Sequence, residues 1–161
     1  MDTVTGRIGG KVILTFDFTF CNFMFRRLLE DKTALEVTQK VKELKIAFAA
    51  KQRRFGGVFP LILTDNGGEF ANVSAVEADL DGEREAHLFF CDPNCSYQKP
   101  HVEKNHTLFR DIVPKCTSFD DFTQDTVDLI FSHVNSVKRK SLNGKTSYEM
   151  FVYTFGDIAA K

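Results

Sequence analysis

The chain has 161 residues, of which 43% are hydrophobic and 27% charged, and its formal net charge at pH 7 is −1. This length suits one domain whose core needs no disulfide staples, and the composition is neither disordered nor fibrous. A near-neutral charge disfavours a stand-alone nucleic-acid-binding module, which normally carries a basic excess. It does not exclude an enzyme that acts on DNA through bound cations.

The start of the chain shows no secretory signal, because no basic segment followed by an apolar one is present. The longest apolar stretch, residues 12–25, is too short to span a bilayer and is interrupted by Asp17 and Asn22. We therefore expect a cytoplasmic protein with no membrane partner. No repeat or linker is visible, so residues 1–161 are treated as one domain.

Three β-strands are predicted at the start of the chain. Residues 11–18 and 23–29 are rich in branched and aromatic side chains, and residues 3–5 form a shorter β-prone segment. A glycine-rich turn at 6–10 and a tight connection at 19–22 separate them. These connections favour an antiparallel meander.

The clearest helix begins after Thr33, a plausible N-cap with Glu36 three residues later, as in a capping box. Its apolar side chains repeat at steps of three and four, which places them on one helix face. That face comprises Ala34, Val37, Val41, Leu44 and Phe48, whereas Lys45 and the other charged residues lie mostly off it.

Two further strands are predicted at residues 58–64 and 86–91. The first ends at a strong turn signal, Asp65-Asn66-Gly67-Gly68. A helix over residues 69–78 and a polar loop over residues 79–85 connect this turn to the second strand.

Three helices follow, over residues 101–114, 124–140 and 146–151. Thr123 is expected to cap the second and Thr146 the third. The buried side of the second is predicted to comprise Val127, Ile130, Val134 and Val137. The complete order predicts an α/β fold, with one mixed five-stranded sheet and helices on both faces.

Four cysteines are present, and in an intracellular protein they are expected to be reduced. His87, Cys91, Cys95 and His101 are the residue types that bind zinc, but they lack the tight Cys pair that normally opens a zinc knuckle. Buried or loop cysteines are the favoured interpretation, and a zinc site stays the alternative.

Three acidic residues stand where separate elements begin or end. Asp2 opens the first strand, Asp65 follows an apolar strand, and Glu103 lies in the first turn of a helix. Each alone has an ordinary explanation in turn or capping chemistry. Together they match what a pair of divalent ions requires, which is several carboxylates converging from different elements.

The surrounding motifs make this pattern specific. Residues 63–70, Leu-Thr-Asp-Asn-Gly-Gly-Glu-Phe, resemble the second-aspartate signature of the retroviral-integrase superfamily. Residues 98–105, Gln-Lys-Pro-His-Val-Glu-Lys-Asn, are similar to the loop and helix start that present its third carboxylate, and Glu103 lies 38 positions after Asp65. Residues 2–4 resemble the first-aspartate strand. Residues 139–147 resemble the C-terminal segment of bacterial insertion-sequence transposases.

This resemblance implies a ribonuclease-H-like fold and a DDE-type polynucleotidyl transferase. Asp2, Asp65 and Glu103 would be the catalytic metal ligands, and two Mg²⁺ or Mn²⁺ ions are expected when DNA is bound. DNA, as element ends and target, would be the partner. A homodimer or higher multimer and a bacterial, nucleoid-associated location are further expectations.

The sequence departs from the family pattern at three places. Only Met1 precedes Asp2, so we expect a fragment of a longer transposase with an upstream helix-turn-helix region. Pro100-His101 replaces small residues before Glu103. Ser147 stands where a proline is usual.

Asp17 is a rival first carboxylate, since it also lies near a strand end. We favour Asp2, on the expectation that antiparallel strands place Asp17 far from the start of the first strand.

Other polar residues are candidates for supporting roles, although surface charge or capping would explain most of them. Asn66, Glu69 and His106 are accessory candidates near the carboxylates. Phosphate contacts would come from basic residues, which position DNA without reading its sequence. These are Lys99, Lys104, Arg110, Arg139, Lys140 and Lys145.

Two alternatives to a transposase remain open on the sequence alone. One is a non-catalytic integrase-like remnant used for DNA or protein association, which the near-neutral charge fits. The other is a nuclease with the same ribonuclease-H-like fold, which would degrade nonspecific DNA or RNA–DNA hybrids.

Overall fold

The computed structural model describes residues 1–92 and 100–156, without the side chains of residues 100–104. The chain divides into two compact units, Met1 with Asp31–Gln98 and Asp2–Glu30 with Lys99–Lys161. The expectation of one domain over residues 1–161 stays a prediction. None of the described helices combines the length and apolar character of a membrane span.

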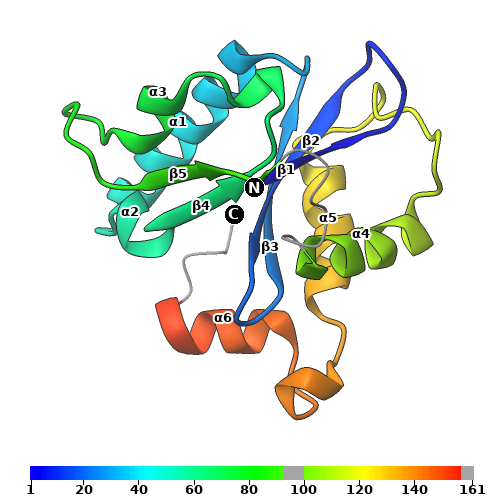
Figure 1. Ribbon diagram of the computed structural model, residues 1–161. Helices are drawn as coiled ribbons and strands as arrows, with labels where there is room; N and C mark the ends of the chain where they lie inside the picture. Colours follow the sequence, from blue (N-terminus) through cyan, green and yellow to red (C-terminus); the bar gives the residue numbers. More distant parts are fainter. Residues whose placement is uncertain (93–99, 157–161) are drawn as a thin grey trace. The chain divides into compact units, whose positions relative to one another are not determined.

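The second unit is built on the three-stranded sheet that the sequence predicts. Strands β1 Asp2–Thr5, β2 Val12–Phe18 and β3 Phe23–Leu29 run antiparallel in the order β1-β2-β3 (Figure 1). Asp2 pairs with Thr15, and Phe18 pairs with Phe23 at the hairpin end. The meander is therefore confirmed.

One face of this sheet packs on helices α4 Pro100–Ile112 and α5 Gln124–Asn135. Val4, Ile13, Met24 and Leu28 lie on this face, because side chains alternate along a strand and paired residues share a side. They form one apolar cluster with residues of α4, of α5 and of the segment between these helices, comprising Phe109, Val113, Phe119, Val127, Ile130, Phe131 and Val134.

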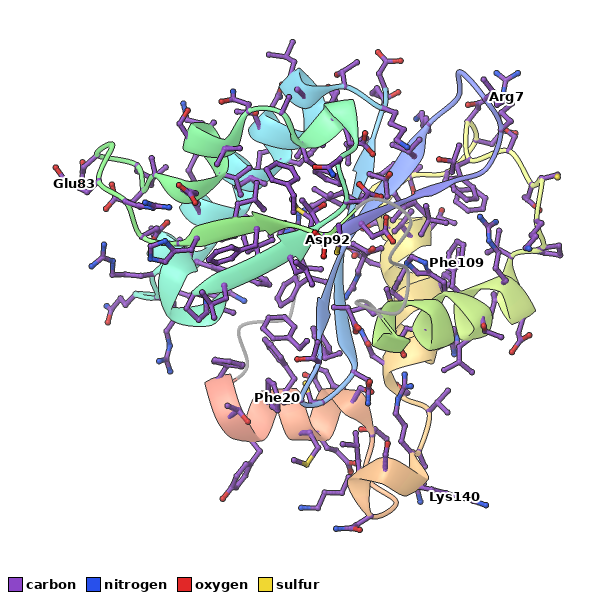
Figure 2. The ribbon with its side chains drawn as sticks, viewed as in Figure 1. Arg7, Phe20, Glu83, Asp92, Phe109 and Lys140 are labelled. Atoms are coloured by element: carbon purple, nitrogen blue, oxygen red, sulfur yellow. The ribbon has the colours of Figure 1, made fainter. Side chains whose placement is uncertain are left out.

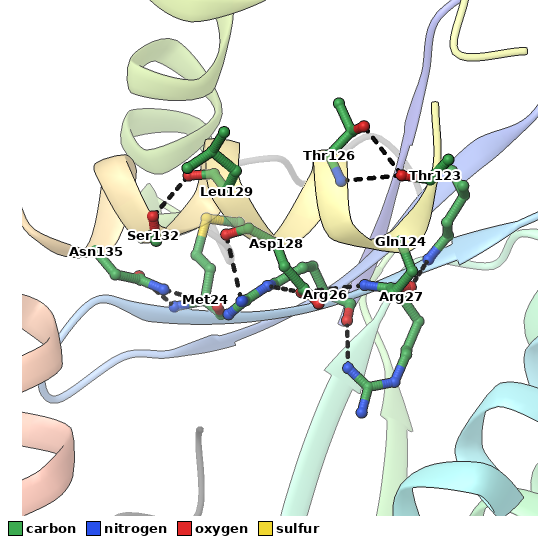
Figure 3. Close-up of polar contacts among 11 residues, drawn as sticks. Met24, Arg26, Arg27, Thr123, Gln124, Thr126, Asp128, Leu129, Ser132 and Asn135 are labelled. Carbon is green, nitrogen blue, oxygen red and sulfur yellow. Dashed lines mark hydrogen bonds and ion pairs between the residues drawn. The ribbon is translucent and has the colours of Figure 1, made fainter. Parts of the chain in front are cut away.

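Polar contacts fix the register of α5 on β3 (Figure 3). The Asn135 side chain accepts from Met24 N at 3.0 Å and donates to Met24 O at 3.1 Å. Arg26 Nε lies 2.6 Å from Asp128 Oδ1. Burying these groups costs little, because each has a partner.

The predicted helix over residues 124–140 is too long, since α5 ends at Asn135. The physical reason is that Ser136 and Val137 are weak helix formers and that Lys138 bridges to Thr146 instead. Val137 is consequently exposed, in contrast to its predicted burial, whereas Val127, Ile130 and Val134 are buried as expected.

Helix α6 Ser147–Phe155 covers the opposite face of the sheet near the hairpin. It begins at the predicted cap Thr146, which forms a capping box with Glu149, and it extends further than expected. Phe151 stacks on Phe23 at 4.3 Å between ring centroids. Phe20, labelled at the hairpin tip in Figure 2, contacts Phe155 of the same helix. Helices therefore cover both faces of this three-stranded sheet.

The first unit contains helices and a two-stranded parallel sheet. Its helices are α1 Ala34–Ala50, α2 Phe55–Val58 and α3 Val73–Glu77, with a 3₁₀ turn η1 Gly68–Phe70. Strands β4 Leu61–Thr64 and β5 His87–Phe90 pair in parallel. The five predicted strands are thus present, but among the described residues they form two sheets rather than one.

The expected strand over residues 58–64 begins later than predicted. Residues Phe55–Val58 form the short helix α2 instead. Phe55 and Phe59 are buried, with their ring centroids 4.8 Å apart, and both rings contact Phe48 of α1. Burial of these aromatic rings therefore overrides the strand propensity of the segment.

Helix α1 begins as predicted, with Thr33 accepting from Glu36 N. Val37, Val41, Leu44 and Phe48 are buried, which confirms the apolar face. Lys45 was expected off that face but is only 5% exposed. Its ammonium donates to the carbonyl oxygens of Ala75, Val76 and Ala78, and these acceptors make its burial possible.

Candidate functional site

Asp65 lies in the turn directly after β4, at the carboxyl edge of the parallel pair. It is exposed, and its Oδ1 accepts from Gly67 N at 3.1 Å. Asn66 Nδ2 donates to Cys91 O at 3.3 Å, while Cys91 N donates to Thr64 O at 2.7 Å. The ends of β4 and β5 therefore hold this turn from both sides, and its carboxylate remains accessible.

Glu69 supports the same turn from a buried position. Its Oε1 lies 3.1 Å from Lys32 Nζ, and its side chain is 5% exposed. A Cβ at Gly67 would meet the Glu69 carboxylate, so a larger residue there would displace that side chain. The sequence predicted Asn66 and Glu69 as accessory residues. Each of these side chains makes a contact that supports the Asp65 turn.

Asp92 lies at the same carboxyl edge, two residues beyond β5, and is exposed (Figure 2). Because parallel strands end at the same edge, the pairing of Thr64 with Phe90 brings the turns after both strands to that edge. No local sequence pattern predicts that Asp92 lies at the same edge as Asp65, since 22 residues separate β4 from β5.

Asp2 is the first residue of β1 and is half-buried. It pairs with Thr15, whose hydroxyl donates to Asp2 O at 3.2 Å. The Asp2 side chain accepts from Thr3 N at 2.8 Å. Asp2 is two residues from Val4, so it shares the sheet face that packs on α4 and α5.

Glu103 belongs to α4, which the sequence predicted at this place. Its side chain, like that of Lys104, lies outside the described residues, and so does Lys99. Among the His, Cys, Asp and Glu side chains that are described, no group of three lies together as metal ligands would. The convergence of Asp2, Asp65 and Glu103 stays a prediction.

The expectation that Asp17 lies far from the start of β1 is wrong. In an antiparallel pair the end of β2 lies beside the start of β1, and the register places Asp17 only two residues beyond Thr15, the partner of Asp2. Asp17 also shares the face of Asp2. What distinguishes it is its chemistry, because Asp17 Oδ1 accepts from the buried amide of Asn105 at 2.7 Å.

Arg110 and Arg139 are less available to DNA than the sequence suggested. Arg110 donates to Thr5 O at 2.9 Å and lies over the Phe109 and Phe119 rings. Arg139 is buried, which lowers its pKa, while the negative charge of Asp17 acts to raise it.

Lys140 lies at the start of the 3₁₀ turn η3 Lys140–Leu142 and is exposed (Figure 2). Lys145 is exposed as well. His106 is half-buried on α4.

The cysteines are free where they are described, and Cys21 and Cys91 are buried. Burial raises the pKa of the Cys21 thiol to about 11, so Cys21 is protonated at neutral pH. Cys95 and the side chain of His101 lie outside the described residues. The alternative zinc site with His87 and Cys91 is therefore untested.

The chain is similar in sequence to an integrase and to insertion-sequence transposases. It is 31% identical over 152 residues, 94% of its length, to ORF3 of Spiroplasma virus SpV1-R8A2 B, which is described as an integrase. It is 32% identical over 79 residues to the transposase for insertion sequence IS1086 of Cupriavidus metallidurans. It is 35% identical over 63 residues to the IS30A transposase InsI of Escherichia coli.

These matches cover 94%, 49% and 39% of the chain, but only 44%, 22% and 16% of the respective relatives. The chain thus spans less than half the length of the proteins it matches. No family model matches it.

Proposed function

Since the chain is a homologue of insertion-sequence transposases and integrases, we propose that it is the catalytic core of such an enzyme. The observation that carries this proposal is the similarity to an integrase over 94% of the chain. The proposed activity is hydrolysis of DNA phosphodiesters and strand transfer by a 3′-hydroxyl. DNA would be the partner, and the enzyme would work as a multimer in a bacterial cytoplasm.

Asp2, Asp65 and Glu103 are the proposed metal ligands. Their carboxylate oxygens are the donors that Mg²⁺ and Mn²⁺ prefer, and the exposure of Asp65 supports access to a cation. When bound, a pair of such ions supplies an activated nucleophile and stabilisation of the leaving oxygen. A ribonuclease-H-like fold belongs to the same proposal.

The remaining residues of the Asp65 turn would orient its carboxylate. Asn66 ties the turn to Cys91 O, and Glu69 is held by Lys32. Exposed Lys140 and Lys145, together with Lys99 and Lys104, are proposed to contact DNA phosphates. Arg110 is proposed to support α4, since its guanidinium donates to Thr5 O and Pro114 O.

Metal binding tests this assignment directly. We expect Mn²⁺ titrated into the wild-type chain to give a binding isotherm that weakens at least tenfold in Asp65→Asn and in Glu103→Gln, because each loses a charged ligand. Asp111→Asn is the matched control, since Asp111 is an exposed carboxylate on the same helix as Glu103. Equal affinity in all four proteins would contradict the assignment.

A second measurement separates a transposase from a general nuclease. Cleavage is compared on the DNA ends of the parent element, on unrelated duplex DNA and on an RNA–DNA hybrid. Preference for element ends supports the proposal, whereas equal cleavage of unrelated DNA or of the hybrid favours the nuclease.

A further inference from the structure

Asn105 is a buried polar residue inside a helix, two positions after Glu103. It is fully buried, at 0% exposure, and belongs to the second turn of α4. Asparagine is a poor residue for a helix interior, because its amide competes for backbone hydrogen bonds. A tertiary role therefore explains its position better than helix formation does.

The Asn105 amide connects α4 to the hairpin of β2 and β3. Its Nδ2 donates to Asp17 Oδ1 at 2.7 Å and to Asn22 O at 3.2 Å. The first acceptor is a charged carboxylate near the end of β2, and the second is the backbone of the hairpin turn. A hydrogen bond to a charged group is stronger than a neutral one, so these two bonds fix α4 at this point.

Asp17 interacts electrostatically with the buried Arg139. Burial lowers the pKa of the Arg139 guanidinium, and the negative charge of Asp17 acts to raise it. Asp17 therefore provides a fixed negative oxygen for the Asn105 amide, on the same sheet face as Asp2.

We propose that Asn105 and Asp17 are a positioning pair that holds the start of α4, and thereby Glu103, for metal binding. This inference rests on the proposed function. Glu103 and Asn105 are about 3 Å apart along the axis of a rigid helix, so a shift of α4 at Asn105 also moves Glu103. A displacement of that kind weakens a metal site whose ligands come from different elements.

The test compares Mn²⁺ affinity in variants of this pair. We expect Asn105→Leu and Asp17→Leu to weaken Mn²⁺ binding about tenfold, as for other supporting contacts of metal ligands. Asp17→Asn keeps an acceptor oxygen for Asn105, so it is expected to stay within about twofold of wild type. A loss in Asp17→Asn as large as in Asp65→Asn would overturn the proposal and make Asp17 a metal ligand.

The control is Asn135→Leu. Asn135 is likewise buried and joins a helix to the same sheet, but it connects α5 to β3. We expect it to lower the melting temperature without weakening Mn²⁺ binding. If Asn135→Leu weakens binding as much as Asn105→Leu does, general destabilisation explains the effect and the proposal fails.

A double variant tests whether Asn105 acts through Glu103. In a Glu103→Gln background, Asn105→Leu is expected to cause no further loss of Mn²⁺ affinity, and an additive loss would contradict the proposal. If Asn105→Leu does not fold, Asn105→Ser replaces it, since serine is too short to reach both acceptors. Absent Mn²⁺ binding by wild type would overturn the proposed function itself, whereas equal binding by wild type and Asn105→Leu overturns only this inference.

Discussion

Two buried charged side chains, Lys45 and Glu77, bond to backbone groups of neighbouring elements. Glu77, the last residue of α3, accepts from Leu88 N at 2.8 Å and from Arg84 Nη2 at 2.8 Å. The bond from Leu88 N, supported by Arg84, lowers the pKa of the Glu77 carboxyl below its usual value. Such groups hold neighbouring elements together only while they are charged, so their effect depends on pH.

Glu77→Gln is expected to lower stability at pH 7 by about 1–3 kcal/mol, since a charged acceptor is lost. A lowered pKa in the folded state means that the Glu77 contribution is complete above the unfolded value of about 4.3. It disappears as the pH falls through the lower folded pKa.

Urea unfolding at pH 7 and pH 3 measures this difference. The gap in unfolding free energy between wild type and Glu77→Gln should shrink on acidification. A gap of the same size at both pH values would contradict the role of the Glu77 charge. Glu83→Gln, an exposed glutamate in the adjacent loop, is the control.

At the scale of elements, short helices depend on the longer elements beside them. Helix α3 has only five residues, and isolated helices of that length are not stable in water. Its C-terminal carbonyl oxygens receive the ammonium of Lys45 from α1. Burial lowers the pKa of Lys45, which its charged neighbours Glu85 and Asp79 partly oppose.

We expect Lys45→Met to lower the free energy of unfolding by about 1.5–3 kcal/mol, because buried carbonyl groups lose a charged donor. Hydrogen exchange should increase first in residues 73–77. Lys42→Met is the control, since Lys42 is exposed on the same helix. Equal exchange in both variants would show that Lys45 does not hold α3.

At the scale of the whole molecule, charge limits how the proposed enzyme would bind DNA. Its 21 basic and 22 acidic residues leave a net charge of −1, so general electrostatic attraction to phosphates is weak. The proposed metal ions would supply positive charge where the carboxylates gather. Metal occupancy should therefore control DNA affinity more strongly than surface lysines do.

Fluorescence anisotropy with a labelled duplex checks this expectation. Affinity should rise at least severalfold when Mg²⁺ replaces EDTA at constant ionic strength, and Asp65→Asn should lose most of the rise. Constant ionic strength removes the general effect of salt on phosphate contacts. A rise of the same size in Asp65→Asn would mean that the metal acts elsewhere.

Local sequence patterns by themselves predict several secondary-structure elements of this chain. The three strands of the meander, the start of α1 and the capping box of α6 follow from residue spacing and caps, which act over a few positions. The relation to transposases was also visible locally, since the segment around Asp65 is contiguous in the sequence.

Only the tertiary structure decided features that depend on residues far apart in the chain. The early end of α5, the helical turn at Phe55 and the burial of Lys45 each follow from distant partners. The position of Asp17 is another example. The expected strand directions predicted a large distance from Asp2, whereas the register of β1 on β2 places the two residues near each other. Asn105 gave one local signal, a polar residue inside a helix, but its partner Asp17 lies 88 positions away.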